Sequence, residues 1–446
     1  MLISVILGLI FSLIIVLVFI KFEYAIALYL AYYLLVPIAR LPIDIPIPIG
    51  SKFMCILFFV VFVANYRARI QFKPLEPFIY FFLGIGILIL FQGTGLMLEN
   101  YRTLFYRILT CILFPIVIYG TVVLLPEKSK CIKWALLVSG TIFTLYGLFL
   151  TTMPGVNPYL MVLMPIFGEE FNVAYALGYS GLSGITDGPT VDGRMFGRIS
   201  SVFKHPMTYC LNLGFFLFFI NYVFREHYKV IRLLYQVAII VAILVSGVRT
   251  PILALVLTLL VAVLYRRKVK YALYTSAAMF IFAILLSAIS DDLYNYVGTI
   301  FGSNKTEVSG SSLSMRINQF ISCFDIIANC PLQGKGYDWS NVYLNLHQVH
   351  PKLLAFESLI YVVLCNTGIV GVCLWTRLII KIKQYCNIIK NQDFSLFIIS
   401  ISVYYLAYSC ITGEYGYMEY YLIYFSLFAG LNEASKRRAF LNIRNK

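Results

Sequence analysis

Four arginines and one histidine have the side-chain chemistry of an anion-binding site. Arg194 and Arg198 lie four residues apart in DGRMFGRISSVFKHPMTY. Arg249 interrupts an apolar tract in SGVRTP, Arg316 follows in SSLSMRINQF, and His350 precedes a further apolar run. The planar guanidinium fork of arginine suits phosphate oxygens, and a histidine can take a proton from a hydroxyl. These residue types predict phosphate binding beside a group that can act as a base.

Three further titratable residues lie close to these positions in the sequence. His205 comes just before an apolar run, His347 lies three residues before His350, and Glu357 lies seven residues after it. Glu357 falls inside an apolar run, where a carboxylate is costly unless it is protonated, paired or facing a cavity. Glu357 can therefore be an alternative base, can orient His350, or can form a helix-packing hydrogen bond. His347 can equally be an ordinary loop histidine.

The elements that must position these residues are membrane helices. Of the 446 residues, 61% are hydrophobic and 12% are charged, and the mean hydropathy is +0.85. Apolar runs of about 17–25 residues, long enough to span a bilayer, recur along the chain. The first run has neither a basic segment before it nor a small-residue cleavage site, so we expect a retained span rather than a signal peptide. We predict an all-α, polytopic membrane protein with a single integral membrane domain over residues 1–446.

About 12–13 transmembrane helices account for the apolar runs. The predicted spans are 2–20, 23–38, 53–65, 77–92, 103–125, 134–152, 207–224, 230–246, 250–265, 271–289, 356–376, 394–411 and 420–432.

The charge distribution sets the orientation of these spans. The formal net charge is +15. The connections 65–76, 126–133, 225–232, 266–270 and 376–393 and the tail from 433 hold 22 Lys and Arg against 5 Asp and Glu. These segments alternate along the chain, as the positive-inside rule requires, so we expect them in the cytoplasm. The basic excess reflects topology and gives no reason to expect a nucleic-acid partner.

The same alternation places two long connections, 153–206 and 290–355, on the extracytoplasmic side, together with the short turn that carries Arg249. Connections of this length are commonly functional. In the second one, apolar residues at helical spacing over 313–328 predict a short amphipathic helix that ends at Pro331. Arg316 lies at the rim of its apolar face, where it can also be a simple snorkelling anchor. All five anion-binding candidates thus map to one side of the membrane, which favours an anionic ligand at that surface.

The order of these motifs resembles the O-antigen polymerase and ligase superfamily of bacterial membrane glycosyltransferases. The matching pieces are GRISSVFKHP before a span, SGVRTP between two spans, an arginine helix that closes on PLQGKGYD, and a histidine ahead of ESLIYVVLCNTGIVG. The resemblance covers roughly residues 190–375. It implies a GT-C-like fold and a metal-independent glycosyltransferase that takes oligosaccharide repeat units from undecaprenyl pyrophosphate at the outer leaflet. Ligases of the family typically have Asn, Ser or Gln after the histidine, whereas this chain has His350-Pro351, so the polymerases that build O-antigen or capsule are the nearer resemblance.

The resemblance also implies roles for the candidate residues. Arg249 and Arg316 would hold the pyrophosphate, Arg198 would position donor or acceptor, and His350 or Glu357 would activate the attacking hydroxyl. Substrate contacts are expected from Arg194, Arg198, His205, Arg249, Arg316 and His347. No metal and no cofactor are expected. The expected partners are the lipid-linked oligosaccharide, membrane lipids, a chain-length regulator and a flippase, at the bacterial cytoplasmic (inner) membrane with a periplasmic active face.

Three other interpretations compete with a polymerase. A ligase of the same superfamily would transfer finished glycan. A secondary transporter or lipid-linked glycan flippase would bind its substrate near mid-membrane on broken helices, and the Gly-x-Gly at 84–86 and the break at SGVRTP are compatible with that reading. A structural membrane subunit without activity is a third possibility.

Overall fold

The computed structural model describes residues 2–36, 51–66, 72–93, 95–153, 157–167, 199–203, 205–226, 228–265, 313–347, 350–414 and 416–444. Within these ranges the fold is helical, and the only backbone pairing of extended type is an isolated bridge between His350 and Leu354. The all-α prediction is confirmed.

Helices fill twelve of the thirteen predicted spans, and the other one, 271–289, lies outside the described residues. The helices in these spans are α1 (Leu2–Ile20), α2 (Phe22–Leu35), α3 (Ser51–Asn65), α4 (Glu76–Gln92), α5 (Met97–Ile108) continuing through a π-helix η2 (Leu109–Leu113) into α6 (Phe114–Leu124), α7 (Ser129–Leu150), α11 (Pro206–Val223), α12 (Lys229–Val245), α13 (Thr250–Tyr265), α18 (Leu359–Ile388), α19 (Gln392–Thr412) and α20 (Tyr417–Arg444). The two long connections add α8 (Pro158–Phe167), α16 (Leu313–Ile327) and α17 (Trp339–His347). The amphipathic helix predicted around Arg316 is α16.

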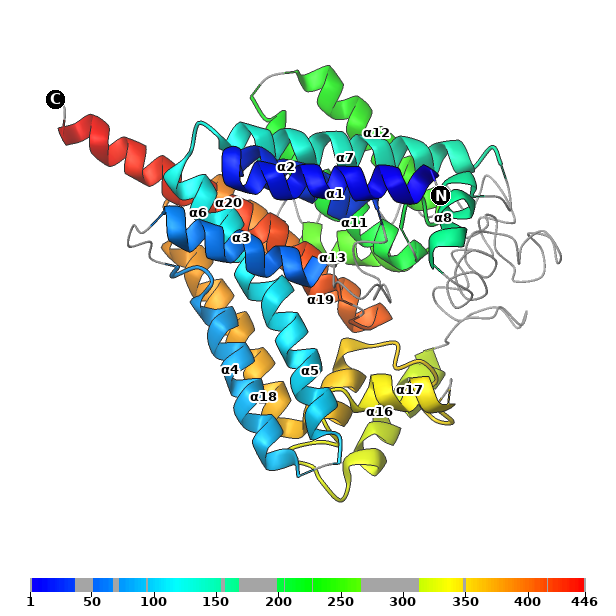
Figure 1. Ribbon diagram of the computed structural model, residues 1–446. Helices are drawn as coiled ribbons and strands as arrows, with labels where there is room; N and C mark the ends of the chain where they lie inside the picture. Colours follow the sequence, from blue (N-terminus) through cyan, green and yellow to red (C-terminus); the bar gives the residue numbers. More distant parts are fainter. Residues whose placement is uncertain are drawn as a thin grey trace. The chain divides into compact units, whose positions relative to one another are not determined.

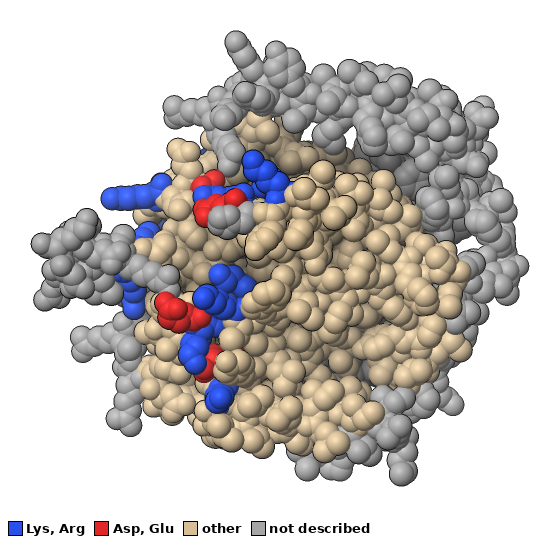
Figure 2. Space-filling model, turned by 90° about the horizontal axis from the view of Figure 1, so that it is seen from above, with Lys and Arg blue, Asp and Glu red and all other residues tan. Residues whose placement is uncertain are grey.

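Five helices in the described part of the chain are long and apolar enough to cross a membrane: Met97–Leu124, Ser129–Leu150, Pro206–Val223, Leu359–Ile388 and Gln392–Thr412. Five more are apolar but shorter, at 10–17 residues. Large apolar side chains such as Leu9, Phe19, Leu83 and Phe91 are exposed on the helix surfaces. On the face shown in Figure 2, wide areas of the described surface carry no charged side chain. The chain is a polytopic helical membrane protein.

The chain divides into two compact units. Unit 1 comprises Met1–Arg67 and Thr121–Ser309, and unit 2 comprises Ala68–Gly120 and Gly310–Lys446. In unit 1, α2 packs along α7, and α11 packs against α7 and α12 (Figure 1). Lys128, the N-cap of α7, forms an ion pair with Glu23 of α2, with 2.5 Å between Nζ and Oε1. The single membrane domain expected from the sequence stays a prediction.

Unit 2 holds the helices that build the candidate site. α4, α5 and α18 run beside one another, α18 and α20 pack on α19, and α16 and α17 pack against α18 (Figure 1). α18 starts at Leu359, with Ser358 as its N-cap, and continues to Ile388, well past the predicted end at 376.

α18 is broken at Gly368, where φ is +60° and ψ is −156°. The segment that links α16 to α17 fills the break. The amides of Lys335 and Gly336 donate to the carbonyls of Cys365 and Asn366 at 2.8 and 3.1 Å. On the other side of the break, the amides of Ile369 and Val370 donate to the carbonyls of Pro331 and Leu332 at 2.9 and 3.1 Å. A buried helix end must find such partners, because an unpaired backbone group away from water is costly.

We expect Gly368→Ala to lower the stability of the protein. A Cβ at this position would lie 2.5 Å from the Pro331 carbonyl oxygen and would require a backbone conformation that only glycine adopts readily. The strained backbone alone costs about 1–3 kcal/mol. Thermal unfolding of the detergent-purified protein measures the loss. Gly86→Ala is the matched control, since its Cβ would make an ordinary 3.4 Å contact with Leu104; equal melting temperatures for the two variants would contradict the assignment.

Candidate active site

Four of the predicted site residues are not in unit 2. Arg194 and Arg198 lie outside the described residues. His205 and Arg249 belong to unit 1. His205 is the N-cap of α11, and its Nδ1 accepts from the Met207 amide at 3.1 Å.

Arg249 is half-buried just before α13, and its carbonyl accepts from the Ile252 amide at 3.2 Å. The amide of Ile199 donates to the Ser246 carbonyl at 3.3 Å. The end of the first long connection therefore packs against the turn that carries Arg249.

Arg316 and Glu357 form an ion pair within unit 2. Arg316 Nη2 lies 2.9 Å from Glu357 Oε2, and Nη1 donates to the Glu357 carbonyl oxygen at 2.6 Å. The Tyr361 hydroxyl donates to the carbonyl of Arg316 at 2.8 Å, which ties α16 to the first turn of α18. The carboxylate next to an apolar run is thus paired with an arginine, one of the ways by which such a group becomes tolerable.

Glu357 does not lie in the membrane helix, contrary to the predicted span 356–376. The helix begins two residues later, because Phe356 has φ +54° and Ser358 caps the start through its side chain. Glu357 consequently belongs to the loop that joins His350 to α18.

His350 is buried, and its ring is held by two hydrogen bonds to Nδ1 and by contacts with aromatic rings. Nδ1 accepts from the amides of Lys352 and Leu353, each at 3.1 Å. The imidazole packs against Tyr343 and Phe356, with ring centroids 4.8 and 5.5 Å apart. Since Nδ1 accepts two hydrogen bonds, the proton of the neutral ring is on Nε2, which makes that nitrogen a donor.

The rings of His347 and His350 both pack on the ring of Tyr343. His347 ends α17, is exposed, and packs on the Tyr343 ring at a centroid distance of 4.7 Å. Desolvation lowers the pKa of His350, and the nearby Lys352 lowers it further. The structure therefore groups Arg316 with Glu357 and His350 with His347, at the two ends of one short segment.

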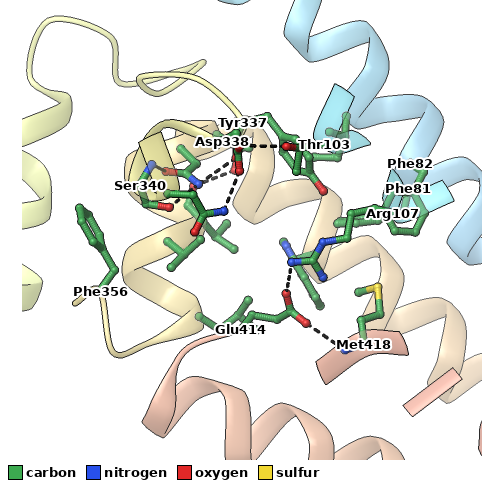
Figure 3. Close-up of a pocket in the computed structure, with 18 of the residues that line it drawn as sticks. Phe81, Phe82, Thr103, Arg107, Tyr337, Asp338, Ser340, Phe356, Glu414 and Met418 are labelled. Atoms are coloured by element: carbon green, nitrogen blue, oxygen red, sulfur yellow. Dashed lines mark hydrogen bonds and ion pairs between the residues drawn. The ribbon is translucent and has the colours of Figure 1, made fainter. Parts of the chain in front are cut away.

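A pocket in unit 2 adds candidate residues that the sequence analysis did not single out. Arg107 of α5 pairs with Glu414, with 2.8 Å between Nη2 and Oε2, and both side chains point into the pocket (Figure 3). Glu414 Oε1 also accepts a hydrogen bond from the backbone amide of Met418 at 2.9 Å, so the carboxylate caps the first turn of α20. The charged pair is largely buried, with exposed side-chain fractions of 22% and 8%. The π-helix η2 starts two residues after Arg107, and such wide turns often mark functional positions.

Asp338 is the second carboxylate of the pocket. Oδ2 accepts from the Thr103 hydroxyl at 2.8 Å, and Oδ1 accepts from the side-chain Nδ2 of Asn341 at 2.7 Å. Its own amide donates to Asn100 Oδ1 at 2.8 Å. Burial raises the pKa of Asp338, whereas its hydrogen bonds with Asn341 and Thr103 lower it. The carboxylate is thus oriented by neutral donors.

Gln92 and Asn366 hold the Asp338 segment on the helix break. Gln92 Nε2 donates to the carbonyls of Gln333 and Asn366 at 2.6 and 2.8 Å, and its Oε1 accepts from the Tyr337 amide. Asn366 Nδ2 donates to the Tyr337 carbonyl and to Ser340 Oγ, each at 2.9 Å. Side chains from two membrane helices therefore fix the position from which Asp338 enters the pocket.

The pocket is lined by side chains of α4, α5, α17 and α18 together with the segments that carry Asp338, Phe356 and Glu414, and part of it is open to the outside. Phe81 and Phe82 lie on one side and Phe356 on the other (Figure 3). Phe356 also packs on His350, so the pocket adjoins the predicted residues. In the described part of the chain, no group of three or more His, Cys, Asp and Glu side chains could hold a metal ion.

Residues 234–376 match the family model described as O-antigen ligase. The matched segment includes Arg249, Arg316, His350 and Glu357, and also Asp338. Arg107 and Glu414 lie outside it. No curated protein matches the chain.

We expect Glu414→Gln to destabilise the protein strongly, because it leaves the Arg107 charge buried without a counter-charge. Breaking a buried pair in this way costs about 3–5 kcal/mol. The double variant Arg107→Met/Glu414→Gln should lose less than the sum of the two single variants, because it removes both charges. SDS titration in mixed micelles measures the free energy of unfolding of the native protein, the two single variants and the double variant, which together form a double-mutant cycle. If the loss in the double variant equals the sum of the losses in the single variants, Arg107 and Glu414 do not interact.

We expect His350 to titrate below the ordinary histidine pKa of about 6.5, with the proton of its neutral form on Nε2. Because its pKa in the folded protein is lowered, the stability that neutral His350 contributes is present above its unfolded pKa. That contribution is lost as the pH falls through the folded pKa. NMR of protein labelled with ¹⁵N-histidine, assigned with His350→Gln, reports both properties. A His350 signal that titrates above 6.5, or a neutral ring protonated on Nδ1, would contradict the geometry.

Proposed function

Because the chain belongs to the O-antigen polymerase and ligase superfamily through residues 234–376, we propose that it is a polymerase of bacterial surface polysaccharide. It joins oligosaccharide repeat units carried on undecaprenyl pyrophosphate into O-antigen or capsular polysaccharide. The reaction takes place at the outer leaflet of the cytoplasmic membrane, on the side where the charge pattern puts the two long connections. The enzyme is a glycosyltransferase whose donor is the lipid pyrophosphate itself.

The observation that carries this proposal is the position of Arg316 beside Glu357 at the start of a membrane helix. The pair fixes the guanidinium while leaving it partly exposed, at 24% of its side chain. Glu357 uses two of the five N–H donors of Arg316. The remaining donors suit phosphate oxygens, which arginine binds in a bidentate manner. A lipid diphosphate whose sugar projects out of the bilayer would meet such a group at its own depth.

The reaction needs a leaving group and a base, and the donor supplies the first. Sugar C1 is already bonded to pyrophosphate, so catalysis has to stabilise the negative charge that grows there when the C1–O bond breaks. Arg316 supplies that electrostatic stabilisation. The acceptor hydroxyl attacks C1 and gives its proton to a base, and no metal or nucleotide sugar is required.

Glu357 suits the role of base better than His350 in this geometry. The lone pair of His350 on Nδ1 accepts two backbone hydrogen bonds, so His350 can act as base only if residues 352–353 release it. Glu357 is 40% exposed and uses one carboxylate oxygen in its ion pair. We assign proton acceptance to Glu357 and donation from Nε2, toward a sugar or phosphate oxygen, to His350. The contributions expected from Arg194, Arg198, His205, Arg249 and His347 stay predictions.

Two alternatives are kept because specific observations favour them. The matched family description favours a ligase that transfers finished glycan, although the His350-Pro351 sequence does not follow the usual ligase pattern. The break in α18 at Gly368 favours a transporter or flippase, since discontinuous membrane helices often form transport sites. The expected partners of the polymerase, a chain-length regulator and a flippase, belong to the same proposal.

We expect cells that carry Arg316→Ala in place of the native protein to keep single-repeat glycolipid while losing long chains. Removing one stabiliser of transition-state charge typically costs about 10²–10³ in rate. Electrophoresis of the surface glycan measures the chain-length ladder. Arg377→Ala is the control, since Arg377 is an exposed arginine on α18 itself, and Arg249→Ala tests the arginine of unit 1.

Other results would identify the alternatives. A normal ladder in an Arg316→Ala strain that contains normal amounts of the protein would overturn the assignment. Repeats that accumulate on the cytoplasmic side would indicate a flippase, and long chains that stay on undecaprenyl pyrophosphate would indicate a ligase.

A further inference from the structure

The charge of the pocket lined by Arg107, Glu414 and Asp338 is unsuited to a pyrophosphate. One cation and two carboxylates line it, and the cation is already paired at 2.8 Å. A diphosphate placed there would meet two negative groups in a partly desolvated space, where like charges repel strongly. The pocket therefore selects a ligand without negative charge.

The polar groups of the pocket match a ligand rich in hydroxyls. Two of the roughly four lone-pair sites of the Asp338 carboxylate are used, by Thr103 and Asn341, which leaves acceptor capacity toward the pocket. Asn341 offers a second amide hydrogen, and the Thr103 hydroxyl can accept. Alternating donors and acceptors of this kind fit neighbouring hydroxyls, each of which donates one hydrogen bond and accepts others.

Aromatic rings supply the rest of the lining. Phe81 packs edge-on against Trp375 with a centroid distance of 5.0 Å, and both line the pocket. Phe356 lines the opposite side (Figure 3). The C–H faces of a pyranose ring are apolar and carry a slight positive charge, so they pack on the negative faces of aromatic rings. A hydrocarbon chain would also contact these rings, but it would leave Asp338 and Asn341 desolvated without new partners.

We propose that this pocket binds an uncharged sugar of the lipid-linked oligosaccharide, through Asp338 and Asn341 on its hydroxyls and through the aromatic rings on its ring face. The proposal rests on the proposed function for the identity of the oligosaccharide. Phe356 connects the pocket to the reaction site, because it lines the pocket, packs on His350 and precedes Glu357 in the chain. The bound sugar lies beside the Arg316–Glu357 pair, and the pocket thereby selects which repeat unit is polymerised.

The test uses the full-length protein in detergent and the free repeat-unit oligosaccharide, released by mild acid from the lipid-linked pool of the same cells. Trp375 lines the pocket, so tryptophan fluorescence reports binding, and Trp375→Phe checks the origin of the signal. We expect Asp338→Asn to raise the dissociation constant about 10- to 100-fold, the loss of affinity typical of removing a hydrogen bond to a charged group. Asn341→Ala should raise the dissociation constant less, by about 5- to 10-fold, because the hydrogen bond that is lost is neutral.

Asp325→Asn is the matched control, an exposed carboxylate of unit 2 that pairs with Lys352 and does not line the pocket. It should bind the oligosaccharide as the native protein does. Inorganic pyrophosphate is the second probe, and its binding should depend on Arg316 and be unaffected by Asp338→Asn. Melting temperatures of all variants show that each is folded before its binding is compared.

The outcomes separate this inference from the proposed function. Oligosaccharide binding that is equal in Asp338→Asn, Asn341→Ala and Asp325→Asn would overturn the sugar pocket, even if Arg316→Ala abolishes the chain-length ladder. Binding that depends on Asp338 would uphold the sugar pocket, even if the ladder of Arg316→Ala is normal and the polymerase proposal fails. Pyrophosphate binding that is lost in Asp338→Asn would also overturn the inference.

Discussion

The candidate site depends on the break in α18 and on the segment that fills it. Interrupting a membrane helix leaves carbonyls on one side and amides on the other without partners, a cost that a bilayer cannot relieve with water. Residues 331–336 supply these partners from their own backbone, on both sides of Gly368. The segment between α16 and α17 therefore completes the backbone hydrogen bonding of α18, and Asp338, at the end of this segment, lines the pocket.

A second feature of unit 2 is that each site arginine has a carboxylate partner. Arg316 has Glu357, and Arg107 has Glu414. The two ion pairs differ in how exposed they are to solvent. The Arg316–Glu357 pair is the more exposed of the two, so an anion can compete for the guanidinium, whereas Glu414 is almost fully buried and holds Arg107 inside a pocket of net negative charge. Neighbouring regions with opposite preferences can receive the charged and uncharged parts of one substrate.

The sequence predicted most of the fold because a bilayer imposes strong patterns. The predicted spans match the helix ends to within six residues except at the C-terminal ends of α18 and α20, which extend twelve residues further, and the amphipathic helix around Arg316 is present as α16. The start of α18 was misplaced because Phe356 continues the apolar run, although its backbone is not helical. Its end was misplaced because the basic segment after 376 stays helical, with Leu378, Ile382 and Cys386 buried at four-residue spacing. Charge pattern alone does not show that such a segment keeps packing against its neighbours.

The pocket could be predicted only in part. Arg107 stands in an apolar span, which is itself a signal of function, but its partner Glu414 comes from a distant connection. The motif PLQGKGYD ends in Asp338, yet nothing in its sequence indicates that this carboxylate lines the same pocket as Arg107. The pairing of Arg316 with Glu357 was also beyond sequence reasoning, since 41 positions separate them. His350 was found as a candidate by its place before a span. Its tautomer follows from hydrogen bonds to Lys352 and Leu353 that only the folded loop creates.

Reconstitution tests the central claim most directly. The purified protein is placed in liposomes together with undecaprenyl-pyrophosphate-linked single repeats, and the glycans are analysed by mass spectrometry. The account predicts glycans of two or more repeats joined by new glycosidic bonds, with one undecaprenyl pyrophosphate released for each bond. Repeats that only cross the bilayer, with no new bond and no lipid pyrophosphate released, would contradict it.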